Sequence, residues 1–521
     1  MNTTGTTTTQ MDVHGQSRLV RNVLTNWGAM AVQVVSGFVI PRLIDRNLSQ
    51  EALGLWDLAW SIVIYFTLIQ MGVTSSINRY VAFHRARDDF DGVNRVVTSV
   101  AFVMRGMGAV AVVAAALCAW AIGTLFYGNL GNHIPEARWL VFLLGLDVAV
   151  QISATVYASV LTGCHRWDLH NGIQAGTSAL TVVGMIIALF TGQGLVALAL
   201  IHVGGEALGR SGRAIAAYRI CPWLQIRSRH FHWDTAREML AFGGKTSITQ
   251  VSQLVMNSTL SVMIAAHLGP AALALYSRPL SLMRNLSVFV NKYAMVFSPT
   301  ISSLQAADEH VKVRDLTLTA TRTGIYLALP ALLFLLVFGA EVLRLWMGNR
   351  YADPALISLI VVAFAFQVCH VPLFKALVGL NLHGQPGVVN LFAALLTIAA
   401  VYISLNFAGG GLHETAICVA VAMTVTNGIY LPWYACHKLS LSLRTFWQQV
   451  WRGPIFCAVP FALCLLLARI RFANSLGTAA LVGGATGSCV LFACYWTVVL
   501  PDRWKHRLLS RFSLVRKPKH V

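Results

Sequence analysis

The sequence predicts an all-α, polytopic membrane protein with about 14 transmembrane helices. Hydrophobic residues make up 56% of the 521 positions and charged residues only 11%, whereas charged residues are about 25% of a typical soluble protein. Apolar runs of about 20 residues, the length that crosses a bilayer, recur along nearly the whole chain. Lys and Arg gather in alternate connections between these runs, as the positive-inside rule requires.

The first twelve predicted spans form two halves. Residues 22–220 contain spans at 22–44, 53–77, 96–126, 138–163, 169–191 and 194–218, and residues 244–437 contain spans at 244–267, 271–304, 316–347, 355–380, 386–408 and 413–436. Residues 1–21 are polar and predict a disordered cytoplasmic tail, and 221–243 form a basic linker. The region 438–501 adds two spans as an appendage, at 454–470 and 475–500, before a basic tail at 502–521.

The two halves repeat each other weakly. Gln33–Ile62 aligns without a gap to Gln253–Leu282, 220 positions later, and eight of the thirty aligned residues are identical. Six spans separate the two copies, so both copies run in the same direction through the membrane. This predicts two parallel six-helix lobes around a central cavity, an arrangement found in transporters.

The distribution of Lys and Arg predicts the orientation. Twenty-four of these residues lie in the tails and connections on the side of the N-terminus, and six lie in the connections on the other side. This asymmetry places both termini in the cytoplasm. It also accounts for most of the net charge of +19, so no nucleic-acid partner is expected.

One short motif suggests nucleotide binding, but its context argues against it. The segment "GGKT" at 243–246 matches the end of a phosphate-binding loop, whose first glycine would stand at Met239. That loop needs the glycine because its backbone amides wrap the phosphates closely. The ten cysteines include no Cys-x-x-Cys pair, which argues against a zinc site. We expect no cofactor and no metal.

Polar side chains form stripes on two predicted spans. Gln250, Gln253 and Asn257 share one face of the seventh span, and Asn26 and Gln33 share a face of the first. Polarity confined to one face indicates that this face avoids lipid. Hydrogen bonds between helices and a water-filled cavity between the lobes both explain the stripes.

Charged residues inside the spans are the main site candidates, because a charge is costly in a bilayer. Arg278 and Lys292 share a face of the eighth span with Ser281 and Asn285, while Arg105 and Lys375 lie in the third and tenth spans. A cationic interior suits an anionic cargo such as a pyrophosphate. Asp147 and Glu206 are candidates for ion coupling, although a structural ion pair is the favoured explanation for them. Glu206 and Arg210 are spaced as an i,i+4 pair, although Arg210 and Arg213 also fit snorkelling at an interface.

Several segments resemble the Wzx-type polysaccharide flippases of the multidrug/oligosaccharidyl-lipid/polysaccharide exporter superfamily. These are "EALGLWDLAWSIVIYFTLIQMGVTSSINRYVAFHRARDD" in the second span, "LGPAALALYSRPLSL" at the seventh and eighth, and "YASVLTGCHRW" at the end of the fourth. The resemblance covers roughly residues 20–440. It implies translocation of undecaprenyl-pyrophosphate-linked oligosaccharides across the inner membrane of a bacterium for surface polysaccharide biosynthesis. Membrane lipids and polysaccharide polymerase and co-polymerase proteins are the candidate partners.

Two alternatives remain open from the sequence. A cation-coupled multidrug exporter would share the fold, although drug cations favour an acidic cavity and the charged residues in these spans are mainly basic. A polysaccharide polymerase or glycosyltransferase would need acids or bases for catalysis on a sizeable outer loop. The longest predicted outer connection, near 127–137, offers only His133 and Glu136. The protein is therefore not expected to be an enzyme.

Overall fold

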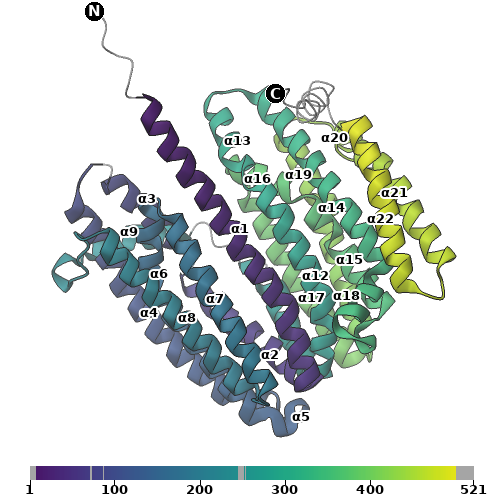
Figure 1. Ribbon diagram of the computed structural model, residues 1–521, viewed down its shortest axis with the longest axis horizontal. Coiled ribbons are helices and arrows are strands. Elements are labelled where there is room, and N and C mark those ends of the chain that lie inside the picture. The colour runs from purple at the N-terminus through teal and green to yellow at the C-terminus, as the bar shows by residue number, and fades with distance from the viewer. Residues whose placement is uncertain (1–7, 71–72, 86, 245–250, 253, 500–521) are drawn as a thin grey trace, which may run out of the picture. The chain divides into compact units, whose positions relative to one another are not determined.

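The computed structural model describes residues 8–70, 73–85, 87–244, 251–252 and 254–499 (Figure 1). Its regular elements over these ranges are all helices, which confirms the predicted all-α class. Eleven described helical segments are long and apolar enough to cross a membrane. Helices α8 and α12, together with the short apolar stretch Val255–Leu268, occupy the three other predicted spans. The structure is therefore compatible with fourteen spans.

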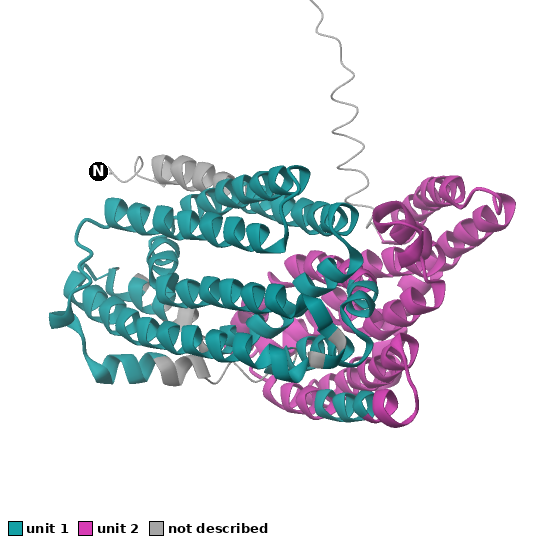
Figure 2. Ribbon diagram, turned by 90° about the horizontal axis from the view of Figure 1, so that it is seen from below, with its two compact units in different colours: residues 1–277, 394–402 teal, residues 278–393, 403–521 magenta. Residues whose placement is uncertain are grey.

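The chain forms two compact units, shown in different colours in Figure 2. Unit 1 comprises Met1–Ser277 and Ala394–Tyr402, and unit 2 comprises Arg278–Ala393 and Ile403–Val521. The helices up to the unit boundary are α1 (Thr8–Asn47), α2 (Gln50–Val63), α3 (Val73–Arg85), α4 (Phe90–Leu125), α5 (Tyr127–Leu130), α6 (Ile134–Gly163), α7 (Trp167–Phe190), α8 (Leu195–Ile220), α9 (Trp233–Gly244) and α11 (Leu260–Leu268). Helix α12 (Pro270–Ala294) crosses that boundary.

The remaining helices are α13 (Phe297–Ala306), α14 (His310–Met347), α15 (Pro354–Cys369), α16 (Val371–Gly379), α17 (Gly384–Phe407), α18 (Leu412–Met423), α19 (Leu431–Lys438), α20 (Leu443–Val450), α21 (Arg452–Arg471) and α22 (Leu476–Cys494). Within unit 2, α14 packs against α15 and α21, and α15 packs against α18. Phe338, Phe461 and Leu465 form a buried cluster where α14, α21 and α22 meet.

Local sequence signals explain where several helices start. Ser49 precedes α2 and its hydroxyl accepts a hydrogen bond from the Ala52 amide at 3.0 Å. Asp89 precedes α4 and caps it in the same way, through the Gly92 amide at 2.8 Å. Such caps satisfy amides that have no partner inside the helix. Gly269 separates α11 from α12 with a φ of +87°, a conformation that other residues rarely adopt.

The two copies of the sequence repeat contact each other within unit 1. The Gln50 side chain at the start of α2 donates to the Ala271 carbonyl at the start of α12, over 2.9 Å. Helix α2 also packs against α11. A β-carbon on Gly54 would lie 1.8 Å from the Pro270 carbonyl oxygen, so only glycine permits this approach. Gln50 and Pro270 are the first residues of α2 and α12 and occupy equivalent positions of the repeat. The two copies therefore meet at the starts of equivalent helices.

Two features differ from, or refine, the sequence expectations. Helix α1 begins at Thr8, inside the segment expected to be a disordered tail. The stretch before Gly244 is helix α9, which contains Met239, where a phosphate-binding loop would require a strand. Lys245 and Thr246 lie outside the described residues.

Candidate functional site

Unit 1 contains a cavity of about 460 Å³ among its spanning helices. Its walls come from α2, α6, α7 and α8, and its lining includes Trp60, Asp147, Gln151, Thr155, His170, Gln174, His202, Glu206, Arg210 and Arg213. The volume falls within the range of small-molecule sites. Unlike most of the surrounding surface, the lining is rich in charged and hydrogen-bonding groups.

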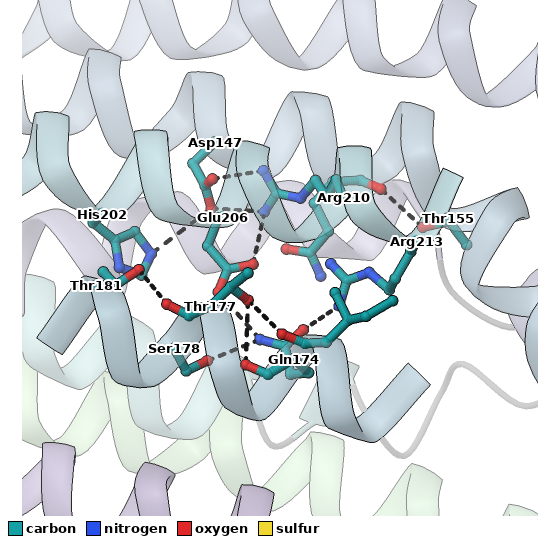
Figure 3. A network of polar contacts seen from close by, with 12 residues as sticks. Asp147, Thr155, Gln174, Thr177, Ser178, Thr181, His202, Glu206, Arg210 and Arg213 are labelled. Carbon is teal, nitrogen blue, oxygen red and sulfur yellow. Dashed lines mark hydrogen bonds and ion pairs between the residues drawn. The ribbon is translucent and has the colours of Figure 1, made fainter. Parts of the chain in front are cut away.

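Arg210 and Asp147 form a buried ion pair at the centre of this lining (Figure 3). The guanidinium of Arg210 on α8 donates to both carboxylate oxygens of Asp147 on α6, over 2.7 and 3.1 Å. Both residues are at most 6% exposed. A fork of this kind fixes both the distance and the orientation of the two groups.

Two further groups surround the pair. A carboxylate oxygen of Glu206, one turn earlier on α8, lies 3.6 Å from Arg210 Nη2. His202 Nε2, another turn earlier, lies 3.9 Å from Asp147 Oδ2, and the His202 ring contacts the edge of Trp60. The i,i+4 spacing of His202, Glu206 and Arg210 places all three on one face of α8. Asp147 therefore faces a histidine and an arginine, while Arg210 faces two carboxylates.

Helix α7 extends this polar network through Gln174. The Gln174 amide nitrogen donates to Glu206 Oε1 at 3.2 Å and to Ser178 Oγ at 3.1 Å. Its carbonyl oxygen accepts a hydrogen bond from Arg213. Three helices thus share one continuous network, whose labelled side chains point toward one another in Figure 3.

Small residues bring α7 and α8 close enough for this network. A β-carbon on Gly205 would lie 1.8 Å from the Thr181 hydroxyl oxygen, and one on Gly209 would lie 2.8 Å from that of Thr177. Glycines four residues apart form the small-residue face that lets membrane helices approach closely. Thr177 and Thr181 donate to carbonyls of their own helix, so they place no unsatisfied hydroxyl in the contact.

The charge of this cavity differs from the cationic interior that the sequence suggests. Asp147 and Glu206 balance Arg210 and Arg213, so the four groups sum to zero while both histidines are neutral. Arg210 and Arg213 are 6% and 8% exposed and hydrogen-bonded inside the unit, which argues against snorkelling at an interface. Such a lining can exchange hydrogen bonds with a polar cargo.

The structure brings together only part of the predicted site. Asp147 and Glu206, the candidates for ion coupling, meet at Arg210. Elsewhere in unit 1, Asn26 and Gln33 are exposed on α1, Arg105 is exposed on α4 beside Phe102, and Asn257 is half-buried in the π-helical turn before α11. Gln250 and Gln253 lie outside the described residues.

The other candidates belong to unit 2 and differ in burial. Arg278 is 3% exposed on α12, whereas Lys292 near the end of the same helix is exposed. Ser281 and Asn285 between them are half-buried, as is Lys375 on α16. Their contribution to a site therefore remains a proposal.

Sequence reasoning missed Trp60, His170 and Gln174 as lining residues. Gln174 carries a usable signal, because a glutamine inside an apolar span is costly without partners. Trp60 and His170 carry no comparable signal, since aromatic residues are common near the ends of spans.

A family model described as "Polysaccharide biosynthesis protein" matches residues 43–355, which is more than half of the chain. The chain belongs to this family. The matched segment includes every residue of the unit 1 network described above.

Two relatives of this polysaccharide biosynthesis family member match most of its length. The chain is 22% identical over 456 residues to the uncharacterized membrane protein EpsK of Bacillus subtilis (strain 168), covering 84% of this chain and 87% of that protein. It is 21% identical over 425 residues to a putative O-antigen transporter of Shigella flexneri, covering 80% and 97%. These matches and the apolar helices identify a multi-pass membrane protein.

Solved structures show that this family member has the fold of the MOP superfamily. An inward-facing multidrug resistance MATE family transporter superposes with a TM-score of 0.69 at 16% identity, covering 80% of this chain and 96% of that one. The lipid II flippase MurJ in an inward closed conformation superposes with a TM-score of 0.66 at 9% identity, covering 92% and 100%. At these identities the likeness concerns the fold.

Proposed function

We propose that this protein is a flippase that moves undecaprenyl-pyrophosphate-linked oligosaccharides across the inner membrane for surface polysaccharide biosynthesis. The observation that carries the proposal is a network of buried and half-buried charged and amide side chains that lines a cavity of about 460 Å³ among spanning helices. Charged side chains are costly inside a membrane, and where they occur they often mark the path of a polar substrate or ion. The name of the Shigella relative, a putative O-antigen transporter, supports the same class of cargo.

The role that we propose for each side chain follows from its chemistry. Gln151, Gln174 and Thr155 offer hydrogen bonds that suit sugar hydroxyls, and Trp60 offers an apolar ring face. Arg278 in unit 2 is the proposed partner of the pyrophosphate. Asp147 and Glu206 are the proposed sites of ion coupling. The protein would act without chemical change of its cargo, with membrane lipids and the polymerase and co-polymerase proteins as partners.

The test is translocation by the purified, full-length protein in lipid vesicles. An undecaprenyl-pyrophosphate-linked oligosaccharide is placed in the inner leaflet, and its arrival outside is measured with a lectin that cannot cross the membrane. We expect faster exposure than in protein-free vesicles, and a reduced rate with Gln174→Ala. Leu481→Ala, an exposed position on α22, serves as the matched control. An exposure rate equal to that of empty vesicles would refute the flippase.

A multidrug exporter remains the second candidate, because the MATE likeness is strong and two acids line the cavity. An organic cation would bind these acids only after Arg210 released them. The same vesicles with a fluorescent organic cation in place of the lipid decide between the two. Transport of the cation together with an inactive lipid assay would favour the exporter.

We also propose that both termini and the basic connections face the cytoplasm, because Lys and Arg are concentrated on that side. Reporter fusions at Gly131 and Gly410 should report the periplasm, and fusions at Arg87 and Arg229 should report the cytoplasm. Gly131 lies between α5 and α6, and Gly410 lies between α17 and α18. A cytoplasmic report at Gly410 would contradict the model of two parallel lobes.

A further inference from the structure

Two cysteines outside the candidate site lie against each other at one end of unit 1. Cys164 follows α6 directly and Cys221 follows α8 directly, and their sulfur atoms are 3.2 Å apart. Both are free thiols in this structure and are 4% and 1% exposed. A disulfide needs a sulfur separation of about 2.05 Å, so a shift of about 1 Å would allow bond formation.

The backbone around each cysteine is held in place. Next to Cys164, the Thr162 hydroxyl donates to the Asn78 side chain at 2.8 Å, which ties the end of α6 to α3. After Cys221, the Asn94 side chain on α4 donates to the Trp223 carbonyl at 3.0 Å and accepts from the Gln225 amide at 2.8 Å. Helices α3 and α4 therefore hold the two chain segments that carry the sulfur atoms.

The electrostatic surroundings make one of the two thiols the better nucleophile. The hydrogen bond with Cys221 and the nearby Arg85 guanidinium lower the pKa of the Cys164 thiol, against the opposing effect of burial. The same contact raises the pKa of Cys221. Since the thiolate is the reactive form, Cys164 would react first and Cys221 would be the resolving thiol.

We propose that Cys164 and Cys221 form a peroxide-sensitive dithiol site that closes to a disulfide. The Cys164 thiolate attacks one oxygen of hydrogen peroxide, the O–O bond breaks, and hydroxide leaves while a sulfenic acid forms. The Cys221 thiol then attacks that sulfur, forms the S–S bond and releases water. In balance, two thiols and one hydrogen peroxide give one disulfide and two waters, and the two electrons lost by sulfur reduce the peroxide.

The position of the bond connects it to the candidate site. Helix α6 carries Asp147 and helix α8 carries Arg210, and the disulfide would join the ends of these two helices. Any movement of α6 along α8 would then be restrained. Thiols are normally kept reduced in the cytoplasm, on the side where we propose that these ends lie, so the bond would form only under oxidative conditions.

The test uses the full-length protein in membranes, treated with hydrogen peroxide, followed by alkylation of the remaining thiols and peptide mapping. We expect a peptide pair linked through Cys164 and Cys221, reversed by dithiothreitol. Cys164→Ser and Cys221→Ala should each abolish that linked pair, whereas Cys436→Ser, a buried cysteine in unit 2, should leave it unchanged. This readout is independent of the transported cargo.

Translocation measured in the same samples examines the consequence for transport, which rests on the proposed flippase function. Peroxide should reduce the rate of the wild type and leave the rate of Cys221→Ala unchanged, with recovery of the wild type in dithiothreitol. Recovery of Cys164 and Cys221 as two separately alkylated thiols from peroxide-treated wild type would overturn the proposed site. Oxidation of Cys164 to a sulfinic acid without a linked pair would also overturn it.

Discussion

Asp147→Ala is expected to lower the stability of the folded protein by about 3–5 kcal/mol, the usual cost of removing one partner from a buried ion pair. The reason is that Arg210 would keep its charge at 6% exposure after losing the carboxylate that accepts two of its hydrogen bonds, with Glu206 at 3.6 Å left beside it. The measurement is the thermal unfolding midpoint of the purified protein in detergent, together with the amount of protein recovered from the membrane.

Two variants make this result interpretable. Asp147→Leu combined with Arg210→Leu removes both charges and should recover most of the lost stability, since a buried pair and an apolar replacement often have similar stability. Glu136→Ala, at the start of the same helix, removes a half-exposed partner 3.8 Å from His133 and should cost less than about 1 kcal/mol. If Asp147→Ala unfolds at the wild-type midpoint, the Asp147–Arg210 pair does not stabilise unit 1.

Arg278→Ala is expected to abolish or sharply reduce surface polysaccharide while the protein still inserts into the membrane. Arg278 is 3% exposed on α12, and a desolvated cation attracts a pyrophosphate strongly. A hydrogen-bonded charged pair contributes about 1.5–3 kcal/mol, so its loss would weaken binding about 10- to 150-fold. The measurement is polysaccharide export in a strain that depends on this protein, at matched expression.

Matched arginine variants separate charge from position. Arg284→Ala removes an exposed arginine of the same helix and should leave export near the wild-type level. Arg278→Lys should keep part of the function if a point charge suffices, and less if the planar fork is required. Unchanged export in Arg278→Ala, in Lys292→Ala and in the double variant would refute a cationic contact on α12, even if the protein is a flippase.

The fold was predictable because the bilayer imposes a simple rule on sequence. A span needs about 20 apolar residues, and that pattern identified the helices of both units. The boundary at Thr8 was not predictable in this way, because Thr-rich sequence has no amphipathic signal. Helical periodicity places Lys292 on the same face of α12 as Arg278, yet Lys292 is exposed and Arg278 is buried. Periodicity cannot predict this difference, because burial depends on which neighbouring helices cover each turn.

The site was predictable only along single helices. The spacing of Glu206 and Arg210 indicates a pair, and the structure places these groups 3.6 Å apart. The closer partner, Asp147 at 2.7 Å, is 63 residues away on another helix. A single sequence contains no information on which faces of α6 and α8 meet. Snorkelling, which the sequence also allows for Arg210, does not agree with its burial beside Asp147.

The glycine contact between α7 and α8 also affects how this protein could evolve or be redesigned. At Gly205 a larger side chain would displace Thr181 and push apart the helices that carry Gln174 and Glu206. Substitutions at the α7–α8 contact would therefore change the shape of the cavity and the packing of the two helices at the same time. The α6 wall offers more freedom, because Gln151 and Thr155 line the cavity without taking part in that contact. If the cavity binds the cargo as we propose, new cargo preferences should be sought first by varying Gln151 and Thr155.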